Sequence, residues 1–371
     1  MKQYSKPCRP ILFIVSAAAI LALTSCKDEK PSVAPANPTP STVANTGTGA
    51  TAFDKPLKPE GDLKLQIITN GISPFWDAMQ KGMEAEKAVL KCDATRQSPE
   101  KADNNAQKQV FDNAMAANVN GIAVSTIQAD AFASVIDAAI DKGVPVITFD
   151  SDSEKSKRLA YIGTNNFEAG RAAGVEAVKL FPSGGKVVAF VGNMSAQNAR
   201  DRFNGFKKGV EGHKIDVLND QPYEDDKDVG RARRNVQDAI TKFGAQINGF
   251  LGLYSYNGPA IVDEVEKSNL LHKVKIICFD GEPKTLKNLA DGKVDVTVVQ
   301  KPYDFGVLAT RLLYLINRKG YKAAMEELKP DLEKNGMKVD GNNIDTGVDV
   351  ITPTNSKDFL QKLKEKGLES T

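Results

Sequence analysis

The chain has 371 residues, 41% of them hydrophobic and 26% charged, which is the composition of a soluble globular protein with room for two domains. Its formal net charge is +2; without Lys2, Lys6 and Arg9, which lie in an expected leader, the 49 basic residues fall to 46 against 47 acidic ones. Nucleic-acid binding relies on an excess of basic residues, so this balance excludes a nucleic-acid partner. With two histidines in the whole chain, we expect neither a metal site nor a cofactor.

Residues 1–25 have the layout of an export signal. Residues 1–10 carry three basic residues and no acidic one, and residues 11–23 are almost wholly apolar. This apolar run of about 13 residues is short for a membrane span, which takes ~20. The run ends in Leu23-Thr24-Ser25-Cys26, which resembles the bacterial lipoprotein signal and implies cleavage before Cys26 and lipid on Cys26. An ordinary secretory signal with an accidental cysteine is the alternative.

Residues 26–61 are rich in Pro, Ala, Ser, Thr, Asn and Gly and have no apolar periodicity. Such a segment buries too little surface to offset its ordering entropy, so we predict a flexible tether. The globular part would then be exported and held at a membrane surface, facing the periplasm or the cell exterior.

From residue 62 onward, strand-like and helix-like segments alternate. The main apolar, strand-like runs lie at residues 63–68, 121–125, 144–149, 186–191, 249–253, 274–279 and 294–299. Segments with apolar residues at helical spacing connect them, which predicts right-handed crossovers and parallel sheets. After Gly163-Thr164-Asn165-Asn166 the alternation of strand-like and helix-like segments begins a second time. We therefore predict an α/β fold of two similar, doubly wound lobes.

Two of the strand-like runs end in the same pair of residues. Asp150 follows the run 144–149, Asp280 follows the run 274–279, and each aspartate comes directly after a phenylalanine. In open α/β sheets, ligands bind beyond the carboxyl ends of the strands, so we expect both carboxylates to face one cleft between the lobes. The alternative is that each aspartate caps the helix that follows it.

Other candidates lie at predicted strand ends and helix starts. A site for a polyhydroxyl ligand needs carboxylates, amides and arginine for the hydroxyls, and aromatic rings for the apolar face. The expected ligand-binding residues are Thr69, Ser73, Phe75, Trp76, Asp150, Arg200, Tyr256, Asn257, Asp280 and Gln300. Core packing of the aromatic pair, a surface position for Arg200 and a turn position for Gln300 are the alternatives.

Common catalytic motifs are missing from the sequence. It contains no phosphate-binding Gly-x-x-x-x-Gly-Lys-Ser/Thr loop, no His-Glu-x-x-His, no paired Cys-x-x-Cys and no Gly-x-Ser-x-Gly. We therefore expect a binding protein and not an enzyme. The enzymatic alternative is a glycosidase with Asp150 and Asp280 as its carboxylate pair, but closure that shields both acids from water suits retention better than turnover.

Five segments carry a resemblance to a known family. They are Ser73-Pro74-Phe75-Trp76, residues 144–150, Ala199-Arg200-Asp201-Arg202, Phe279-Asp280-Gly281 and Gln300-Lys301-Pro302. In this order and spacing the chain resembles the ribose/galactose-type periplasmic sugar-binding proteins of ABC importers, over roughly residues 62–320. These proteins share a superfamily with the ligand domains of LacI-type repressors.

The resemblance implies the type I periplasmic binding protein fold, in which two lobes joined by three crossovers close on a sugar. The implied segments are 62–163 and 301–325 for the N-terminal lobe, 164–300 and 340–353 for the C-terminal lobe, and 354–371 for a C-terminal tail helix. The aromatic candidates would pack on the sugar ring, and the charged and amide candidates would bind its hydroxyls. The implied function is capture of a monosaccharide or similar polyol by a monomer that delivers it to an ABC permease.

The sequence also departs from the family pattern. Ser151 stands where an arginine usually follows the first strand-end aspartate. The strand end at 254–258 leaves open which of Tyr254, Tyr256 and Asn257 faces the ligand. A receptor that presents a sugar or autoinducer-like ligand to a signalling sensor is the alternative function. A transcriptional regulator would need an N-terminal helix-turn-helix where this chain has its export signal.

Overall fold

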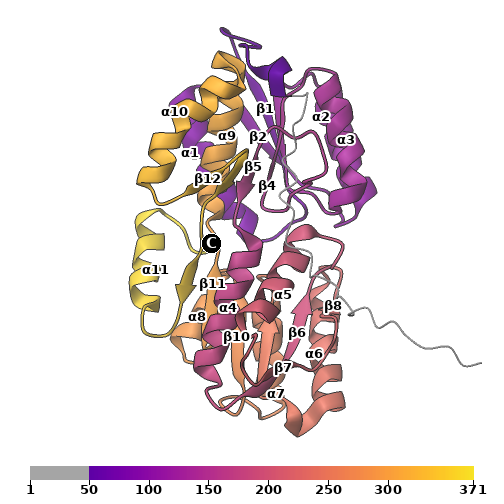
Figure 1. The fold of residues 1–371 in the computed structure, drawn as a ribbon, viewed down its shortest axis with the longest axis vertical. Helices are drawn as coiled ribbons and strands as arrows, with labels where there is room; N and C mark the ends of the chain where they lie inside the picture. Colours follow the sequence, from indigo (N-terminus) through magenta and orange to yellow (C-terminus); the bar gives the residue numbers. More distant parts are fainter. Residues whose placement is uncertain (1–49) are drawn as a thin grey trace, which may run out of the picture. The chain divides into compact units, whose positions relative to one another are not determined.

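The computed structural model describes residues 50–371, so the predicted signal, Cys26 and most of the predicted tether lie outside the described residues. The described chain forms two seven-stranded sheets with helices packed on both (Figure 1). No helix within residues 50–371 is long and apolar enough to cross a bilayer.

The first sheet has the strand order β12-β13-β5-β4-β3-β1-β2. Its strands are β1 (Lys64–Ile68), β2 (Asp93–Gln97), β3 (Gly121–Val124), β4 (Val146–Phe149), β5 (Tyr161–Gly163), β12 (Lys338–Asp340) and β13 (Asn343–Asp345). All neighbours pair in parallel except β12, which runs antiparallel to β13. The central strands β3 and β4 are buried along their whole length, as their continuous apolar runs predict.

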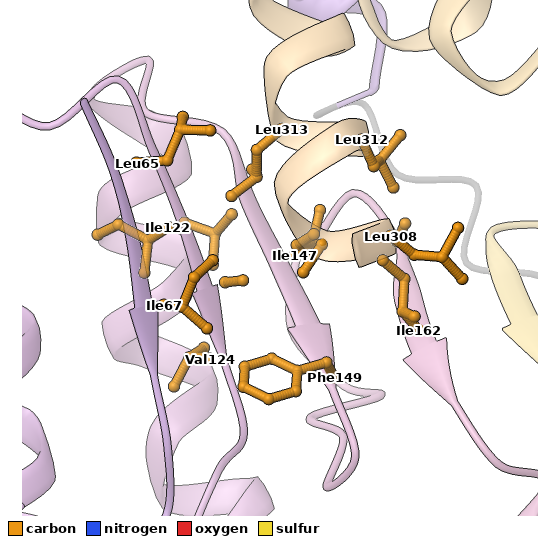
Figure 2. Packing of buried hydrophobic residues seen from close by; sticks show 14 of the residues in the cluster. Leu65, Ile67, Ile122, Val124, Ile147, Phe149, Ile162, Leu308, Leu312 and Leu313 are labelled. Carbon is orange, nitrogen blue, oxygen red and sulfur yellow. The ribbon is translucent and has the colours of Figure 1, made fainter. Parts of the chain in front are cut away.

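Five helices belong to the first lobe: α1 (Phe75–Leu90), α2 (Asn104–Ala116), α3 (Ala129–Asp141), α9 (Pro302–Lys319) and α10 (Tyr321–Lys334). On one face of the sheet, Leu308, Leu312 and Leu313 of α9 point toward the apolar side chains of β1, β3, β4 and β5 (Figure 2). Phe149, the last residue of β4, closes this core at the end of the sheet from which Asp150 emerges.

The second sheet has the order β14-β11-β10-β9-β6-β7, and β8 pairs with the far end of β6. Its strands are β6 (Gly185–Val191), β7 (Ile215–Val217), β8 (Tyr223–Glu224), β9 (Gly249–Gly252), β10 (Lys275–Phe279), β11 (Val296–Val299) and β14 (Asp349–Ile351), the last of which is antiparallel. Its helices are α4 (Asn166–Leu180), α5 (Gln197–Gly209), α6 (Val229–Phe243), α7 (Asn257–Lys267) and α8 (Pro283–Ala290).

The chain passes between the two sheets three times. The crossings lie between β5 and α4, between β11 and α9, and between β13 and β14. The predicted pair of similar α/β lobes joined by three crossovers is therefore confirmed. Each sheet is mixed, because each carries one antiparallel strand at its edge.

The end of the chain is divided differently from the expected segments. Residues 340–353 were expected in the second lobe, but β13 pairs with β5 of the first sheet and only β14 joins the second. The physical reason is the edge of β5, whose backbone groups bond to this segment: Tyr161 N–H donates to Asn342 O (2.9 Å) and Thr346 N–H donates to Gly163 O (2.8 Å). Helix α11 (Ser356–Glu365) lies within the predicted tail.

The described part of the predicted tether packs on the first lobe. A short 3-10 helix, η1 (Ala50–Phe53), places the Phe53 ring in the first core with 1% of its surface exposed. The backbone N–H groups of Leu57 and Lys58 both donate to Asn317 O of α9 (3.1 and 3.0 Å). Residues 53–58 are thus bound to the lobe by the burial of Phe53 and by the backbone bonds to α9, and they do not form a free linker.

Candidate functional site

Asp150 and Asp280 leave their strands in the same way. Both have left-handed backbones, with φ of +58° and +64°, a conformation that aspartate adopts more readily than most residues. Each is fixed by the neighbouring strand, since Asp150 N–H donates to Ile162 O (3.0 Å) and Asp280 N–H to Val298 O (2.8 Å). The two carboxylates, one from each lobe, line a single cavity of about 370 Å³.

Both lobes contribute polar and aromatic side chains to this cavity. Those of the first lobe are Asn70, Ser73, Phe75, Trp76, Glu100 and Asp150. Those of the second lobe are Asn198, Arg202, Lys227, Tyr254, Ser255, Tyr256, Asp280, Glu282 and Gln300.

Asp150 is held by groups of its own lobe. Its Oδ2 atom accepts hydrogen bonds from the Ser125 hydroxyl (2.8 Å) and, at 3.4 Å, from the Asn70 side-chain amide. Burial raises the pKa of Asp150 to about 6, although the positive charge of Arg202 and the Ser125 bond oppose the shift. At neutral pH this carboxylate is a charged acceptor in a largely dry site.

Arg202 is the central donor of the second lobe. The side chain is buried; its Nε donates to Asn166 Oδ1 (2.9 Å) and its Nη1 to Leu253 O (2.8 Å). The guanidinium carbon lies 4.7 Å from the centre of the Phe279 ring, so the phenylalanine of one Phe-Asp pair supports it from beneath. Nη2 is buried and has no hydrogen-bond partner among residues 50–371.

Asp280 and Gln300 form a second polar pair. Gln300 Nε2 donates to Asp280 Oδ1 at 3.0 Å, and Asp280 Oδ2 lies 3.9 Å from Arg202 Nη1. Burial raises the pKa of Asp280, opposed by the charge of Arg202 and the bonds from Gln300. Gln300 Oε1 is buried without a partner in the described chain.

Aromatic rings come from both lobes. Trp76 packs edge-on against Phe75 (4.8 Å between ring centres) and Phe149 (5.8 Å), so Phe149 supports a cavity residue as Phe279 does in the other lobe. Tyr254 and Tyr256 meet edge-on at 6.3 Å on the second lobe. Their hydroxyls donate to Asn198 Oδ1 (3.0 Å) and Asp225 Oδ1 (2.5 Å), which fixes both rings.

Most of the predicted site residues lie at this cavity, namely Ser73, Phe75, Trp76, Asp150, Tyr256, Asp280 and Gln300. The other three predicted residues do not line the cavity and form hydrogen bonds within their own lobes. The Thr69 hydroxyl donates to Gly71 O (2.9 Å), Arg200 Nη1 donates to Ser195 O (2.6 Å), and Asn257 Nδ2 donates to Asp225 Oδ2 (2.9 Å). Of the strand-end residues left open, Tyr254 and Tyr256 line the cavity and Asn257 does not.

Sequence reasoning missed Asn70, Asn198, Arg202, Lys227 and Glu282. For two of them a signal existed. Asn198 and Arg202 are four residues apart on the face of α5 that also buries Ala199, Phe203 and Phe206, whereas Arg200 points away from that face. Continuing the buried stripe of the helix would have selected Arg202.

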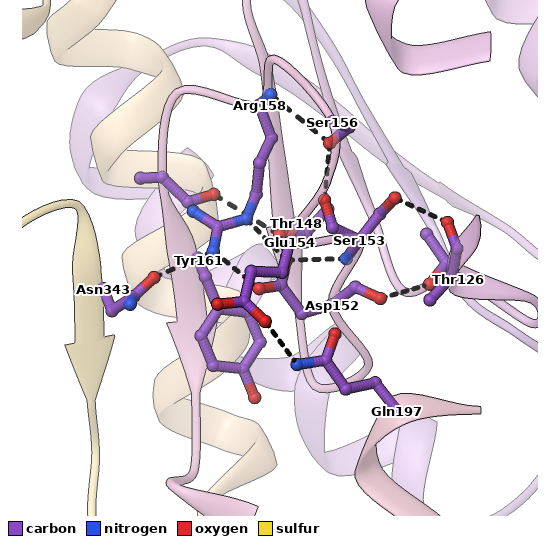
Figure 3. Close-up of polar contacts among 12 residues, drawn as sticks. Thr126, Thr148, Asp152, Ser153, Glu154, Ser156, Arg158, Tyr161, Gln197 and Asn343 are labelled. Carbon is purple, nitrogen blue, oxygen red and sulfur yellow. Dashed lines mark hydrogen bonds and ion pairs between the residues drawn. The ribbon is translucent and has the colours of Figure 1, made fainter. Parts of the chain in front are cut away.

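The loop after Asp150 is fixed by a buried ion pair (Figure 3). Arg158 Nε and Nη2 bind the two oxygens of Asp152 (2.5 and 2.6 Å), and Nη2 also donates to Asn343 Oδ1 of β13 (2.9 Å). This loop begins at Ser151, and Arg158, seven positions later, ties it to the crossing strand β13.

A second hollow does not contain the Phe-Asp ends. It has a volume of about 860 Å³ and lies between α9, α10 and α11, and neither Asp150 nor Asp280 lines it. Within residues 50–371 no cluster of His, Cys, Asp and Glu has the arrangement of a metal site.

Comparison with known proteins identifies the family. Residues 67–322, which include both Phe-Asp strand ends and most of both lobes, match the model of the periplasmic binding protein domain. The chain belongs to this family. The predicted membership and the type I periplasmic binding protein fold are confirmed.

Relatives of this periplasmic binding protein carry sugar names. The xylose/arabinose-binding protein XylF of Sulfolobus acidocaldarius is 26% identical over 323 residues, which cover 81% of this chain and 73% of XylF. The ribose import binding protein RbsB of Bacillus subtilis is 24% identical over 328 residues, or 86% of this chain and 98% of RbsB. A solved ABC-transporter solute-binding protein from Burkholderia graminis, in complex with D-arabinose, is 28% identical with a TM-score of 0.69, covering 81% of this chain and 98% of the other.

Proposed function

We propose that this protein captures a monosaccharide or similar polyol between its lobes and delivers it, as a lipid-anchored monomer, to an ABC permease. The observation that carries the proposal is the convergence of Asp150 and Asp280 on one cavity from equivalent strand ends of different lobes. A ligand that contacts both carboxylates stabilises the arrangement in which the lobes are together, so binding shifts the population toward closure.

The free polar atoms of the cavity support a hydroxyl-rich ligand. Arg202 Nη2 is a buried donor and Gln300 Oε1 a buried acceptor, and neither has a partner among the described residues. Leaving such a group unsatisfied costs about 1–3 kcal/mol. A hydroxyl both donates and accepts, so one polyol can satisfy both kinds of group while its apolar face packs on Trp76.

The relatives support the same ligand class, since the names of XylF and RbsB specify pentoses and the Burkholderia graminis structure holds D-arabinose. The cavity volume of about 370 Å³ lies in the ordinary range for small-molecule sites and is large enough for one pyranose or furanose ring.

Calorimetry with a panel of pentoses, hexoses and polyols tests the proposal. We expect at least one to bind at about 1 µM or tighter, which corresponds to about −8 kcal/mol. Asp280→Ala removes a charged acceptor worth about 1.5–3 kcal/mol per hydrogen bond, so affinity should fall by about 10-fold to 100-fold or more. The recovered sugar should be chemically unchanged.

The control is Asp238→Ala, which removes an exposed aspartate from the same lobe. If no member of the panel binds to the wild-type protein, the proposed function is wrong. If sugar binds equally well to folded Asp280→Ala and to Asp238→Ala, the site assignment is wrong and the function stands.

The lipid anchor rests on the sequence before residue 50. We propose that Cys26 is the first residue of the mature chain and carries lipid, as its position after Leu23-Thr24-Ser25 supports. Intact mass spectrometry of the protein from membranes should show a lipidated chain beginning at Cys26, and Cys26→Ser should leave the membrane fraction. A mature chain that retains Ser25, or starts later than Cys26, contradicts the anchor without affecting the sugar site.

A further inference from the structure

Lys227 reaches from the second lobe to the first. It lies in the loop between β8 and α6, lines the cavity, and is half-buried. Its Nζ donates to the backbone carbonyl of Asn70, which follows β1 in the first sheet, at 2.9 Å. This bond therefore joins the two lobes directly at the cavity.

The backbone conformation of the loop at residues 225–227 fixes the direction in which the Lys227 side chain points. Asp226 and Lys227 are consecutive left-handed residues, with φ of +52° and +65°, and neither is glycine. This conformation costs roughly 1–2 kcal/mol per residue, so it persists only where the surroundings enforce it. Asp225 Oδ1 accepts Lys227 N–H (2.9 Å), and Asp226 N–H donates to Gly192 O (2.8 Å).

The same bond connects the ligand-facing groups of both lobes. On the second lobe, buried Asp225 also accepts the Tyr256 hydroxyl, so the ring that lines the cavity and the lysine share one anchor. On the first lobe, the Asn70 side-chain amide donates to Asp150 Oδ2 (3.4 Å) and to the Ser125 hydroxyl (3.0 Å). Asp225, Lys227 and Asn70 thus link Tyr256 to Asp150, with hydrogen bonds between successive residues.

A second hydrogen bond between the two lobes is more exposed to solvent than the Lys227 bond. Gln197 Nε2 of α5 donates to Glu154 Oε2 of the first lobe at 3.2 Å, with both side chains at the surface (Figure 3). An exposed bond between neutral and charged groups contributes little, because water replaces it. Each bond has one charged partner, but the Lys227 bond is the stronger of the two, since it is half-buried at the cavity wall and water competes with it less.

We propose that Lys227 is a latch that holds the lobes together and thereby sets how long the ligand stays bound. Breaking the Lys227–Asn70 bond is a required part of opening, both for the empty protein and for the protein that holds ligand. The latch therefore slows release of the ligand and cannot speed its entry. This inference rests on the proposed function only for its readout with sugar.

The test compares Lys227→Met with Lys273→Met, which removes an exposed lysine from the same lobe. Small-angle scattering of the full chain without sugar should give a larger mean radius of gyration for Lys227→Met than for the wild type or the control. In stopped-flow experiments with D-ribose, D-xylose and D-arabinose, any sugar that binds should leave Lys227→Met about 10-fold to 100-fold faster and should enter it at least as fast as it enters the control. Lys227→Arg, which keeps a charged donor, should restore part of the slow dissociation.

Equal scattering and equal dissociation rates in Lys227→Met and Lys273→Met overturn the latch. A uniform loss of association rate in Lys227→Met overturns it as well, because that result describes a damaged site. If none of the three sugars binds to the wild-type protein, the scattering comparison alone decides the latch, and the failure belongs to the proposed ligand.

Discussion

At the scale of single residues, the site follows from where strands end. Asp150 and Asp280 are left-handed residues at the ends of buried parallel strands, and the Phe before each supports a cavity residue of its own lobe, Trp76 or Arg202. The Phe-Asp repeat thus has a physical meaning: the ring is a buried support and the carboxylate is the part offered to the ligand.

Protonation of Asp150 should make the affinity for the ligand depend on pH. Its pKa is raised by burial to about 6, and Arg202, Asp280 and Lys227 are the charged groups around it. A hydroxyl that donates to the ionised carboxylate favours the charged form, so binding releases a proton below pH 6. We expect affinity to be constant from about pH 6.5 to 7.5 and to fall by up to about tenfold per pH unit below 6.

Calorimetry across this range, in buffers of different ionisation enthalpy, measures both the affinity and the released proton. Asp150→Asn should bind more weakly at pH 7.5 and show a smaller dependence on pH, because Asp280, whose pKa burial also raises, remains in the cavity. For folding the sign is opposite: the raised pKa means that Asp150 contributes stability below about pH 4, and the contribution is lost as the pH rises through 6. An affinity that increases on acidification contradicts the assignment.

How far the sequence predicted the site is clearest at Arg200 and Arg202. Strand ends are marked by an abrupt change from apolar to polar residues, so Asp150, Asp280 and Gln300 were found. A helix carries no such boundary, and only its buried stripe distinguishes Arg202 from Arg200. The position of Lys227 in the cavity could not be predicted from the sequence. The direction of its side chain depends on the left-handed backbone of Asp226 and Lys227, which their residue types do not indicate.

At the scale of elements, close helix pairs position the site. In α4 a Cβ added at Gly170 would lie 2.0 Å from the carbonyl oxygen of Arg202, so α5 approaches α4 backbone to backbone at the residue that enters the cavity. In the first lobe, a Cβ at Gly82 would lie 2.0 Å from Tyr303 O in the same way, between α1 and α9. Only glycine permits either contact.

Gly170→Ala should therefore weaken ligand binding, although Gly170 itself does not line the cavity. The added methyl group must push α5 outward, and the overpacking is worth roughly 1–3 kcal/mol, so we expect a lower thermal midpoint and an affinity for sugar reduced about tenfold or more. Gly82→Ala is the matched control, with the same clash in the other lobe and no contact with Arg202. If both variants lose stability equally and affinity equally, α4 does not position Arg202 specifically.

Helix α4 packs through small residues. Its buried stripe is Ala169, Ala173 and Ala177 with Gly170 and Gly174 beside it, and such small residues give a weak apolar pattern although they pack completely. Strands β13 and β14 belong to different sheets. Each has three residues, and the distant edges of β5 and β11 decide where each one pairs.

At the scale of the whole molecule, the two lobes and their relation were predictable, and the division of the chain end was not. An alternation of strands and helices predicts a doubly wound sheet, whatever the individual residues are. The alternation begins again after β5, which predicts a second sheet. The assignment of residues 321–345 to the first lobe depends on Leu328, Leu332 and Ile344 filling its core, which no local pattern reveals.

The interleaved order of the lobes bears on how the protein is made. The first core takes residues from η1 to β5 and then from α9 to β13, and the second needs Ile351 of β14 at its edge. A ribosome adds residues in sequence, at roughly 5–20 each second. The first lobe is incomplete until Asp345 of β13 has been synthesised, and the second until Ile351 of β14, 20 residues before the end of the chain. The interleaved order of the segments therefore delays completion of either core until synthesis is almost finished.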